Sequence, residues 1–171
     1  MGTRRLTLLR HGEAQPIDSC TEDFERELTH RGTIEAQEIA ARIVARRLAP
    51  DLILVSPAER AWSTAEIVAG ACDLDVSQVR CARELYLAGP EATWRLIARQ
   101  DAAIGHILIC GHNPGLSEIA SRLGPTRTRR TLPTAGLVTA VWHNAHWHTL
   151  QPETAHSCNE DDPDGDADQW D

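Results

Sequence analysis

Residues 6–14 read LTLLRHGEA, a short apolar run that leads directly into an arginine and a histidine. The same arrangement recurs in LILVSPAER at residues 52–60 and in ILICGHNPG at residues 107–115. Each run is too short for a helix, and its length suits a buried strand bounded by polar residues. Strands are therefore predicted at Leu6–Leu9, Leu52–Val55 and Ile107–Cys110.

Helical patterns fill the gaps between these runs. Apolar residues recur at helical spacing from Ala36 to Leu48, and a second stripe begins at Ala61. Leu96 and Ile97 indicate a third helix. Strands that alternate with helices are typical of an α/β domain with a mainly parallel central sheet.

Two helix starts are predicted where strands end. The SPAE sequence at residues 56–59 has the pattern of a capping box, with proline at the first helical position. Asn113-Pro114 repeats the order of capping residue and proline after the third strand. Both helix N-termini then lie at the carboxyl ends of strands, the side on which open α/β sheets bind ligands.

Two further strands are expected at residues 137–142 and 147–151, joined by a short turn. The sequence from residue 153 on is acidic and polar, a composition that favours disorder. We therefore expect one domain over residues 1–152 and a disordered acidic tail over residues 153–171.

The length of 171 residues and a hydrophobic fraction of 42% suit a single compact domain. The formal charge of -8 is unevenly distributed, because eight of the 25 acidic residues lie in the tail. The other 17 acids are matched by 17 basic residues, all of them arginine. This neutral body argues against nucleic acid as a partner bound through bulk charge.

The apolar runs are all shorter than the roughly 18 residues that a membrane span needs. The run near the N-terminus is also too short for a signal peptide. The five cysteines have no CxxC spacing and are interpreted as free thiols in a reducing compartment. We therefore expect a soluble cytoplasmic protein with no membrane partner.

Four charged or imidazole groups collect at the predicted strand ends: Arg10, His11, Arg60 and His112. If the three strands are neighbours, these groups converge on one pocket beside two helix N-termini. Helix N-termini favour anions, and guanidinium groups bind phosphate oxygens through paired hydrogen bonds. The pattern therefore predicts an anion-binding site suited to phosphate.

A neutral imidazole that faces a bound phosphorus atom can act as a nucleophile. Nearby arginines favour the neutral form because they lower the pKa of the imidazole. Arg10, Arg60 and His112 would stabilise the charge that phosphoryl transfer spreads over three oxygens. The residues alone leave both an enzyme and a phosphate-binding module open.

The string LLRHGEA resembles the signature of the histidine phosphatase superfamily, also called the phosphoglycerate-mutase-like family. The resemblance covers about residues 5–150 and continues through LTHRG (28–32), LVSPAERAWSTAEIV (54–68) and ICGHNPGLSEIASRL (109–123). Within the superfamily, this short chain with its GHNPG sequence is most similar to SixA-type phosphohistidine phosphatases.

The resemblance implies a three-layer α/β/α sandwich and a role for each matching residue. His11 would be the nucleophile and would be transiently phosphorylated, while Arg10, Arg60 and His112 would hold the phosphoryl group. Gly12 would let the backbone pass close to that group. The resemblance implies no metal ion and no organic cofactor.

The sequence departs from the family pattern at two places. Ser63 stands where the family often has glutamine, in the block that supplies Arg60. Glu84 lies near the position from which many members protonate the leaving group, so it is a candidate general acid, but the following Gly89 is one residue later than the common spacing. A weak or absent acid suits phosphohistidine, because the conjugate acid of the departing imidazole has a pKa of about 6.5.

The sequence thus predicts a phosphatase that works through a phosphorylated histidine and removes phosphate from phosphohistidine on a protein. The short chain leaves few residues to cover the pocket, and an open pocket would admit a side chain of a phosphorylated protein. One alternative substrate is a small phosphate monoester. An alternative of another class is a non-catalytic module that binds phosphate or a phosphopeptide.

Overall fold

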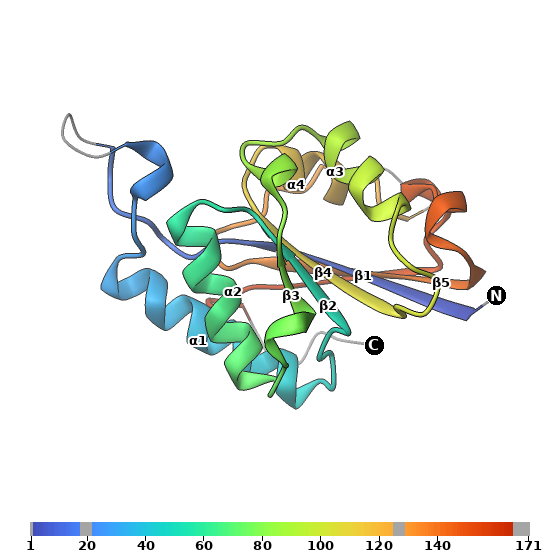
Figure 1. The fold of residues 1–171 in the computed structure, drawn as a ribbon, viewed down its shortest axis with the longest axis horizontal. Helices are drawn as coiled ribbons and strands as arrows, with labels where there is room; N and C mark the ends of the chain where they lie inside the picture. The colour runs from blue at the N-terminus through green and yellow to red at the C-terminus, as the bar shows by residue number, and fades with distance from the viewer. Residues whose placement is uncertain (1, 18–21, 125–128, 166–171) are drawn as a thin grey trace.

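The computed structural model describes residues 2–17, 22–124 and 129–165. These residues form a three-layer α/β/α sandwich, in which helices cover both faces of a six-stranded sheet (Figure 1). Helices α1 and α2 lie on one face, and α3 and α4 lie on the other (Figure 1). The helices are α1 (His30–Ala45), α2 (Glu59–Ala71), α3 (Pro90–Ala98) and α4 (Gly115–Ala120).

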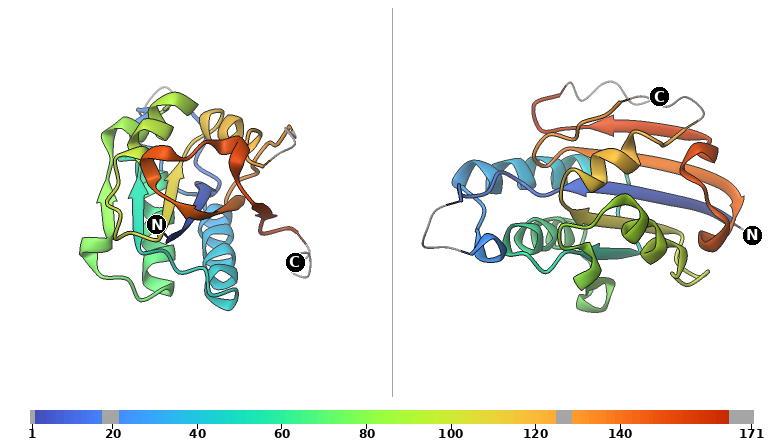
Figure 2. Two further views of the ribbon diagram at one scale, coloured as in Figure 1. Left: turned by 90° about the vertical axis from the view of Figure 1, so that its right-hand side faces the viewer. Right: turned by 90° about the horizontal axis from the view of Figure 1, so that it is seen from above.

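The strand order in the sheet is β3-β2-β4-β1-β5-β6. Strands β1 to β4 pair in parallel, whereas β5 is antiparallel to both β1 and β6. The long strands β1 and β5 run side by side through the middle of the sheet (Figure 2). The strands are β1 (Gly2–Arg10), β2 (Leu52–Val55), β3 (Val79–Cys81), β4 (His106–Gly111), β5 (Leu137–Ala145) and β6 (Ser157–Asp161).

The three predicted strands form and are neighbours, as β2, β4 and β1. In the parallel register, Arg10 pairs with Gly111, and Val55 pairs with Cys110. The residues that follow each strand therefore meet at one edge of the sheet, as the sequence predicts.

The sheet separates two apolar layers, because successive side chains of a strand point to opposite faces. Leu9, Ile53 and Leu108 belong to the layer under α1 and α2. Their chain neighbours Leu8, Leu54 and Ile109 belong to the layer under α3 and α4. Strands buried on both faces explain why the sequence shows continuous apolar runs instead of alternation.

Both predicted helix starts are wrong in detail. Helix α2 begins at Glu59 after Ala58, and no side chain caps it. Helix α4 begins at Gly115 after Pro114. Ser56 accepts a hydrogen bond from the backbone N–H of Ala58, which precedes the helix, and its hydroxyl lies 2.7 Å from an imidazole nitrogen of His112. Asn113 donates to the carbonyl oxygen of Leu132 and accepts from the Ser117 hydroxyl instead of from a backbone N–H of α4.

The strand predicted at residues 147–151 is also wrong. Strand β5 continues to Ala145, and the next residues form a short 3₁₀ turn, Trp147–Thr149. The Trp147 indole is buried and donates a hydrogen bond to the carbonyl oxygen of Ile104 at 2.8 Å. An anchored tryptophan thus holds this segment against the domain, and the segment pairs with none of the strands that the structure describes.

The acidic segment after Pro152 is not disordered over its described part. Residues 157–161 form β6, which adds an edge strand beside β5. The buried carboxylate of Asp161 forms ion pairs with Arg42 in the last turn of α1 and with Arg46, the residue that follows this helix. The disorder prediction was wrong here because composition does not show that arginines at the end of α1 neutralise this charge. Residues 166–171 of the predicted tail lie outside the described residues.

Two smaller expectations concern the cysteines and the membrane. Cys72, Cys81, Cys110 and Cys158 are free thiols, and Cys20 lies outside the described residues. Within the described ranges, the helices are too short or too polar to span a bilayer.

The loop after β1 packs tightly against the first turn of α1. Thr29 caps this helix, since its hydroxyl accepts a hydrogen bond from the backbone N–H of Gly32 at 3.0 Å. The backbone N–H of Thr29 in turn donates to the carbonyl oxygen of Glu13 at 2.9 Å. A Cβ atom added at Gly32 would lie 2.0 Å from that same carbonyl oxygen, so this contact requires glycine.

Two glycine-to-alanine substitutions in helices test the contact. Gly32→Ala is expected to lower the free energy of unfolding by about 1–3 kcal/mol, the usual range for overpacking. Gly70→Ala in α2 is the matched control, because a Cβ there meets no atom within 4 Å. It should raise the free energy of unfolding by about 0.4–1 kcal/mol, since alanine lowers the entropy of the unfolded chain. Urea denaturation measures both, and equal stability of Gly32→Ala and wild type would contradict the close approach.

Candidate active site

A cavity of about 350 Å³ opens at the edge of the sheet where β1 and β4 end. Its lining includes all four side chains that the sequence singles out: Arg10, His11, Arg60 and His112. Arg10 and His11 come from the end of β1, Arg60 from the first turn of α2, and His112 from the residue after β4. The parallel register of these strands accounts for their convergence.

His11 is almost fully buried, and its hydrogen bonds define its tautomer. Its Nδ1 atom lies 2.7 Å from the carbonyl oxygen of Gly12, which can only accept, so Nδ1 carries the proton. The lone pair is then on Nε2, which accepts a hydrogen bond from Nε of Arg60 at 3.3 Å. This is the nitrogen that could attack phosphorus.

Burial lowers the pKa of His11 to about 4. The hydrogen bond to Gly12 opposes this shift, and the charges of Arg60, Arg10 and Arg26 add to it. His11 is therefore neutral at neutral pH, which is the form a nucleophile requires.

His112 lies beside His11, with 5.1 Å between the ring centroids. Burial, together with His11 and Arg60, lowers the pKa of His112 to about 3. Its Nε2 atom lies 2.7 Å from the Ser56 hydroxyl, while its buried Nδ1 atom has no hydrogen-bond partner among the described residues. When Ser56 donates to Nε2, the proton of His112 is on Nδ1 and can bind an oxygen of a ligand.

The two predicted arginines differ in how much of their hydrogen-bonding capacity is occupied. Arg10 donates from Nη1 to the carbonyl oxygen of Leu132 at 2.9 Å, and its buried Nε has no partner in the described part of the chain. Arg60 is only 2% exposed, and besides His11 it contacts Asp23 twice. Its Nη1 donates to the Asp23 carbonyl oxygen at 2.5 Å and its Nη2 to the Asp23 carboxylate at 3.1 Å.

Asp23, Arg26 and Tyr86 are site residues that the sequence analysis missed. Arg26 donates from Nε and Nη2 to one carboxylate oxygen of Asp23, at 3.0 and 2.8 Å. The hydroxyl of Tyr86 donates to the other oxygen at 2.8 Å. The only available signal was position, because Asp23 and Arg26 lie between the RHG and LTHRG blocks, which the fold brings together.

Burial raises the pKa of Asp23, but the hydrogen bonds from Tyr86, Arg26 and Arg60 outweigh it and lower that pKa to about 2. Asp23 is therefore ionised at neutral pH. The pocket lining holds three guanidinium groups, Arg10, Arg26 and Arg60, and two carboxylates, Asp23 and Glu13, which balance part of the positive charge.

Gly12 has a packing role in the structure. A Cβ atom at Gly12 would lie 2.4 Å from the carbonyl oxygen of Gly32 in α1, so the close approach that requires glycine is to the helix. The backbone N–H of Gly12 donates to the Thr64 hydroxyl at 3.1 Å, which fixes the loop to α2. The geometry shows the contact with α1 as the constraint on Gly12, and the expected approach of this residue to a phosphoryl group stays a prediction.

Glu84 does not join the described lining of the pocket. It is exposed and lies in the short 3₁₀ turn Arg83–Leu85, in which Leu85 points into the core. Two later residues of the same segment approach the site instead: Leu87 lines the pocket, and the Tyr86 ring lies 5.9 Å from the ring of His112. The position of Glu84 in the sequence, near that of the family's acid, therefore does not bring its side chain into this pocket.

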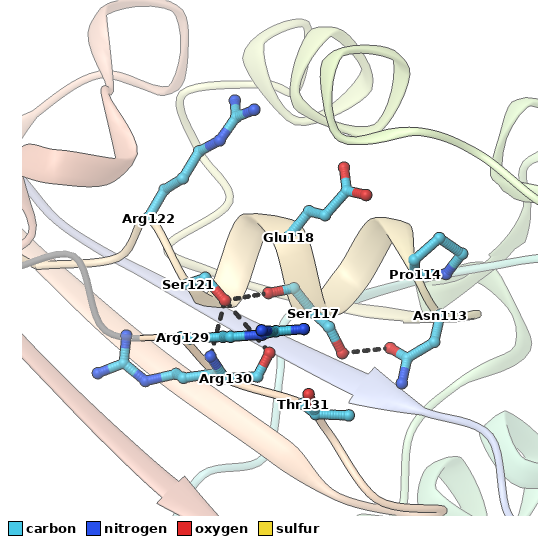
Figure 3. Close-up of a pocket in the computed structure, with 9 residues that line it drawn as sticks. All are labelled: Asn113, Pro114, Ser117, Glu118, Ser121, Arg122, Arg129, Arg130 and Thr131. Atoms are coloured by element: carbon cyan, nitrogen blue, oxygen red, sulfur yellow. Dashed lines mark hydrogen bonds between the residues drawn. The ribbon is translucent and has the colours of Figure 1, made fainter.

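A second cavity, of about 690 Å³, lies along α4 and shares Asn113 with the first (Figure 3). Ser117 and Ser121 project from the helix toward the segment that carries Arg129 and Arg130 (Figure 3). Arg130 is held by an ion pair with Glu160 and by the carbonyl oxygen of Ala120, so much of its charge is already balanced.

The described residues contain no group of three or more His, Cys, Asp or Glu side chains arranged to hold a metal ion. The first pocket instead combines a neutral imidazole with a lone pair, a second imidazole and three guanidinium groups. This set of groups can bind a phosphoryl dianion and transfer it to nitrogen.

The low pKa values of His11 and His112 predict a specific pH dependence. Their values of about 4 and about 3 lie below the roughly 6.5 of an unfolded histidine. The unfolded chain therefore binds protons first, and the free energy of unfolding should fall as the pH drops from about 6.5 toward 4. Carboxylates also titrate in part of this range, so a variant is needed to identify the contribution of the histidines. The free energy of unfolding of His11→Gln, which has one imidazole fewer, should fall less steeply as the pH drops.

Two measurements check this prediction. Urea denaturation at several pH values gives the change of the free energy of unfolding with pH. NMR titration of the imidazole carbons identifies which histidines take up protons. The His11 and His112 signals should move only below about pH 5. Midpoints near the value of an exposed histidine would contradict the described environment.

Comparisons with known proteins agree with this geometry. The family model of the histidine phosphatase superfamily (branch 1) matches residues 6–106, more than half of the chain. A comparison with curated proteins found no match.

Several solved structures have the same fold. A protein described as a phosphohistidine phosphatase, SixA, from Agrobacterium tumefaciens is 29% identical, with a TM-score of 0.73 over 83% of this chain and 96% of its own. A second protein described in the same way, from Nakamurella, is 22% identical, with a TM-score of 0.77 over 91% of this chain and 93% of its own.

A protein described as an α-ribazole-5′-phosphate phosphatase from Escherichia coli is 23% identical. Its TM-score is 0.61 over 80% of this chain and 90% of its own. At this level of identity, as for the Nakamurella protein, the similarity shows the fold. The family match over residues 6–106 carries the assignment, and the chain belongs to the histidine phosphatase superfamily as a histidine-type phosphatase.

Proposed function

We propose that this phosphatase removes the phosphoryl group from phosphohistidine on a protein, with His11 as the nucleophile. The observation that carries the proposal is the state of His11: neutral, proton on Nδ1, and a lone pair on Nε2 within a pocket of guanidinium groups. The Agrobacterium protein described as a phosphohistidine phosphatase, at 29% identity, supports the same substrate.

The reaction takes two displacements at phosphorus. In the first, Nε2 of His11 attacks, the P–N bond of the substrate breaks, and its electron pair remains on the substrate imidazole, which takes up a proton from water. In the second, the oxygen of a water molecule attacks the phosphoryl group on His11, the P–N bond breaks and its electron pair returns to Nε2. Inorganic phosphate leaves, and the proton that the attacking water loses offsets the one taken up in the first step. Arg10, Arg60 and His112 would bind the phosphoryl oxygens in both steps.

The carboxylates near the site support a P–N substrate. Asp23 has a pKa of about 2 and so holds no proton to donate at neutral pH. Glu13 accepts a hydrogen bond from the Thr29 hydroxyl at 2.7 Å, and Glu84 is exposed outside the described lining. An alkoxide leaving group needs a proton, whereas imidazole leaves more readily without a strong acid.

A small phosphate monoester is the second candidate. The cavity of about 350 Å³ is large enough for such a molecule, and the Escherichia coli protein with this fold is described as acting on one.

Three substrates separate these candidates: a phosphohistidine protein, p-nitrophenyl phosphate and glycerol phosphate. The nitrophenolate leaves without a proton, whereas the glycerol alkoxide requires one. Wild type should hydrolyse the phosphohistidine protein fastest and glycerol phosphate slowest. His11→Ala should lose at least about 10³-fold in kcat on each substrate, because the nucleophile is removed.

Two variants serve as controls in the same assay. His143→Ala removes an exposed imidazole that lies outside the pocket lining, and Glu84→Gln removes the exposed carboxylate. Both should retain the wild-type rates. Faster hydrolysis of glycerol phosphate than of the phosphohistidine protein, together with a loss in Glu84→Gln, would contradict the proposal and favour a small monoester.

A further inference from the structure

The arginine that would bind the phosphoryl group is already occupied by another anion of the chain. Arg60 has five N–H donors. Three of its bonds reach Nε2 of His11, the carbonyl oxygen of Asp23 and the carboxylate of Asp23. The bond to Nε2 also engages the lone pair with which His11 would attack.

Asp23 lies between Arg60 and solvent. The side chain of Arg60 is 2% exposed and that of Asp23 is 31% exposed, while both line the same cavity. A phosphoryl group that enters from solvent and binds Nη2 of Arg60 therefore competes with the carboxylate of Asp23 for that nitrogen and for the positive charge of the guanidinium group.

Asp23 has other partners that can hold it once Arg60 is released. Arg26 binds one of its oxygens through two hydrogen bonds, and Tyr86 binds the other. Neither contact involves Arg60, so the Asp23 carboxylate keeps these partners when a phosphoryl group takes its place at Arg60. The exchange is possible within the described arrangement because Arg26 continues to pair with the charge of Asp23.

We propose that Asp23 sets the affinity of the site for its substrate by acting as an internal competitor that occupies Arg60 until a phosphoryl group displaces it. This inference rests on the proposed binding of the phosphoryl group by Arg60. It makes Asp23 a residue that limits binding, whereas a residue that positions Arg60 would improve binding. The two roles predict opposite effects when the carboxylate is removed.

The test measures the Kd of inorganic phosphate by calorimetry, which requires no turnover. Asp23→Asn keeps the size of the side chain and removes its charge, and it should bind phosphate roughly fivefold more tightly or better, since the apparent Kd depends on the fraction of protein with Arg60 free. Tyr86→Phe removes one of the partners that hold Asp23 once Arg60 is released and leaves Arg60 intact. Displacement of the carboxylate should then cost more, so the Kd of this variant should be no lower than that of wild type.

Glu25→Gln is the matched control, because Glu25 is an exposed carboxylate in the same short 3₁₀ turn, Asp23–Glu25. It should bind phosphate as wild type does. An equal increase in phosphate affinity in Glu25→Gln and Asp23→Asn would show that the loss of any nearby negative charge causes the effect, and this result would overturn the inference.

Steady-state kinetics gives a second readout. Asp23→Asn should lower KM with no increase in kcat. Weaker or unchanged phosphate binding by Asp23→Asn in a protein that still hydrolyses its substrate would overturn the inference and leave the proposed function intact. Full activity of His11→Ala would overturn the proposed function, whatever the phosphate affinities are.

Discussion

The parallel register between β1, β4 and β2 is the constraint on which the site depends. It sets Arg10 beside Gly111 and Val55 beside Cys110, so that the chain leaves all three strands at one edge of the sheet. The loop after β1 is fixed there by the close contact of Gly12 with α1 and by the hydrogen bond from its N–H to Thr64. The imidazoles and guanidinium groups thus meet because the observed parallel register brings the ends of these strands to one edge of the sheet.

The chemistry of the pocket follows from burial as much as from charge. Two imidazoles lie 5.1 Å apart among arginines, and both stay neutral because protonation there would cost desolvation and repulsion. A neutral His11 has the lone pair that a nucleophile needs, and Nε of Arg60 donates a hydrogen bond to it. In the proposed mechanism substrate binding rearranges Arg60, and this step would link the affinity of the site to the reactivity of His11.

Local patterns in the sequence predict the fold and the four central side chains, because short apolar runs and the residues after them are local signals. Contacts between distant segments are not encoded in this way. Asp23 and Tyr86 meet only in the folded chain, and Ser56 binds His112 instead of capping a helix. The order of the acidic segment depends on arginines at the end of α1, more than a hundred residues earlier in the chain. The spacing that suggested Glu84 as a general acid did not show that this residue lies in a 3₁₀ turn, exposed and outside the described lining of the pocket.

The most direct test of the account is to trap the phosphorylated enzyme in a single turnover with a phosphohistidine protein as the donor. Rapid quenching followed by peptide mapping identifies the residue that carries the phosphoryl group. The account predicts an acid-labile, alkali-stable phosphoryl group on the peptide that contains His11, which forms and decays as fast as the enzyme turns over. A phosphoryl group on another residue, or hydrolysis at the wild-type rate by His11→Asn, would contradict it.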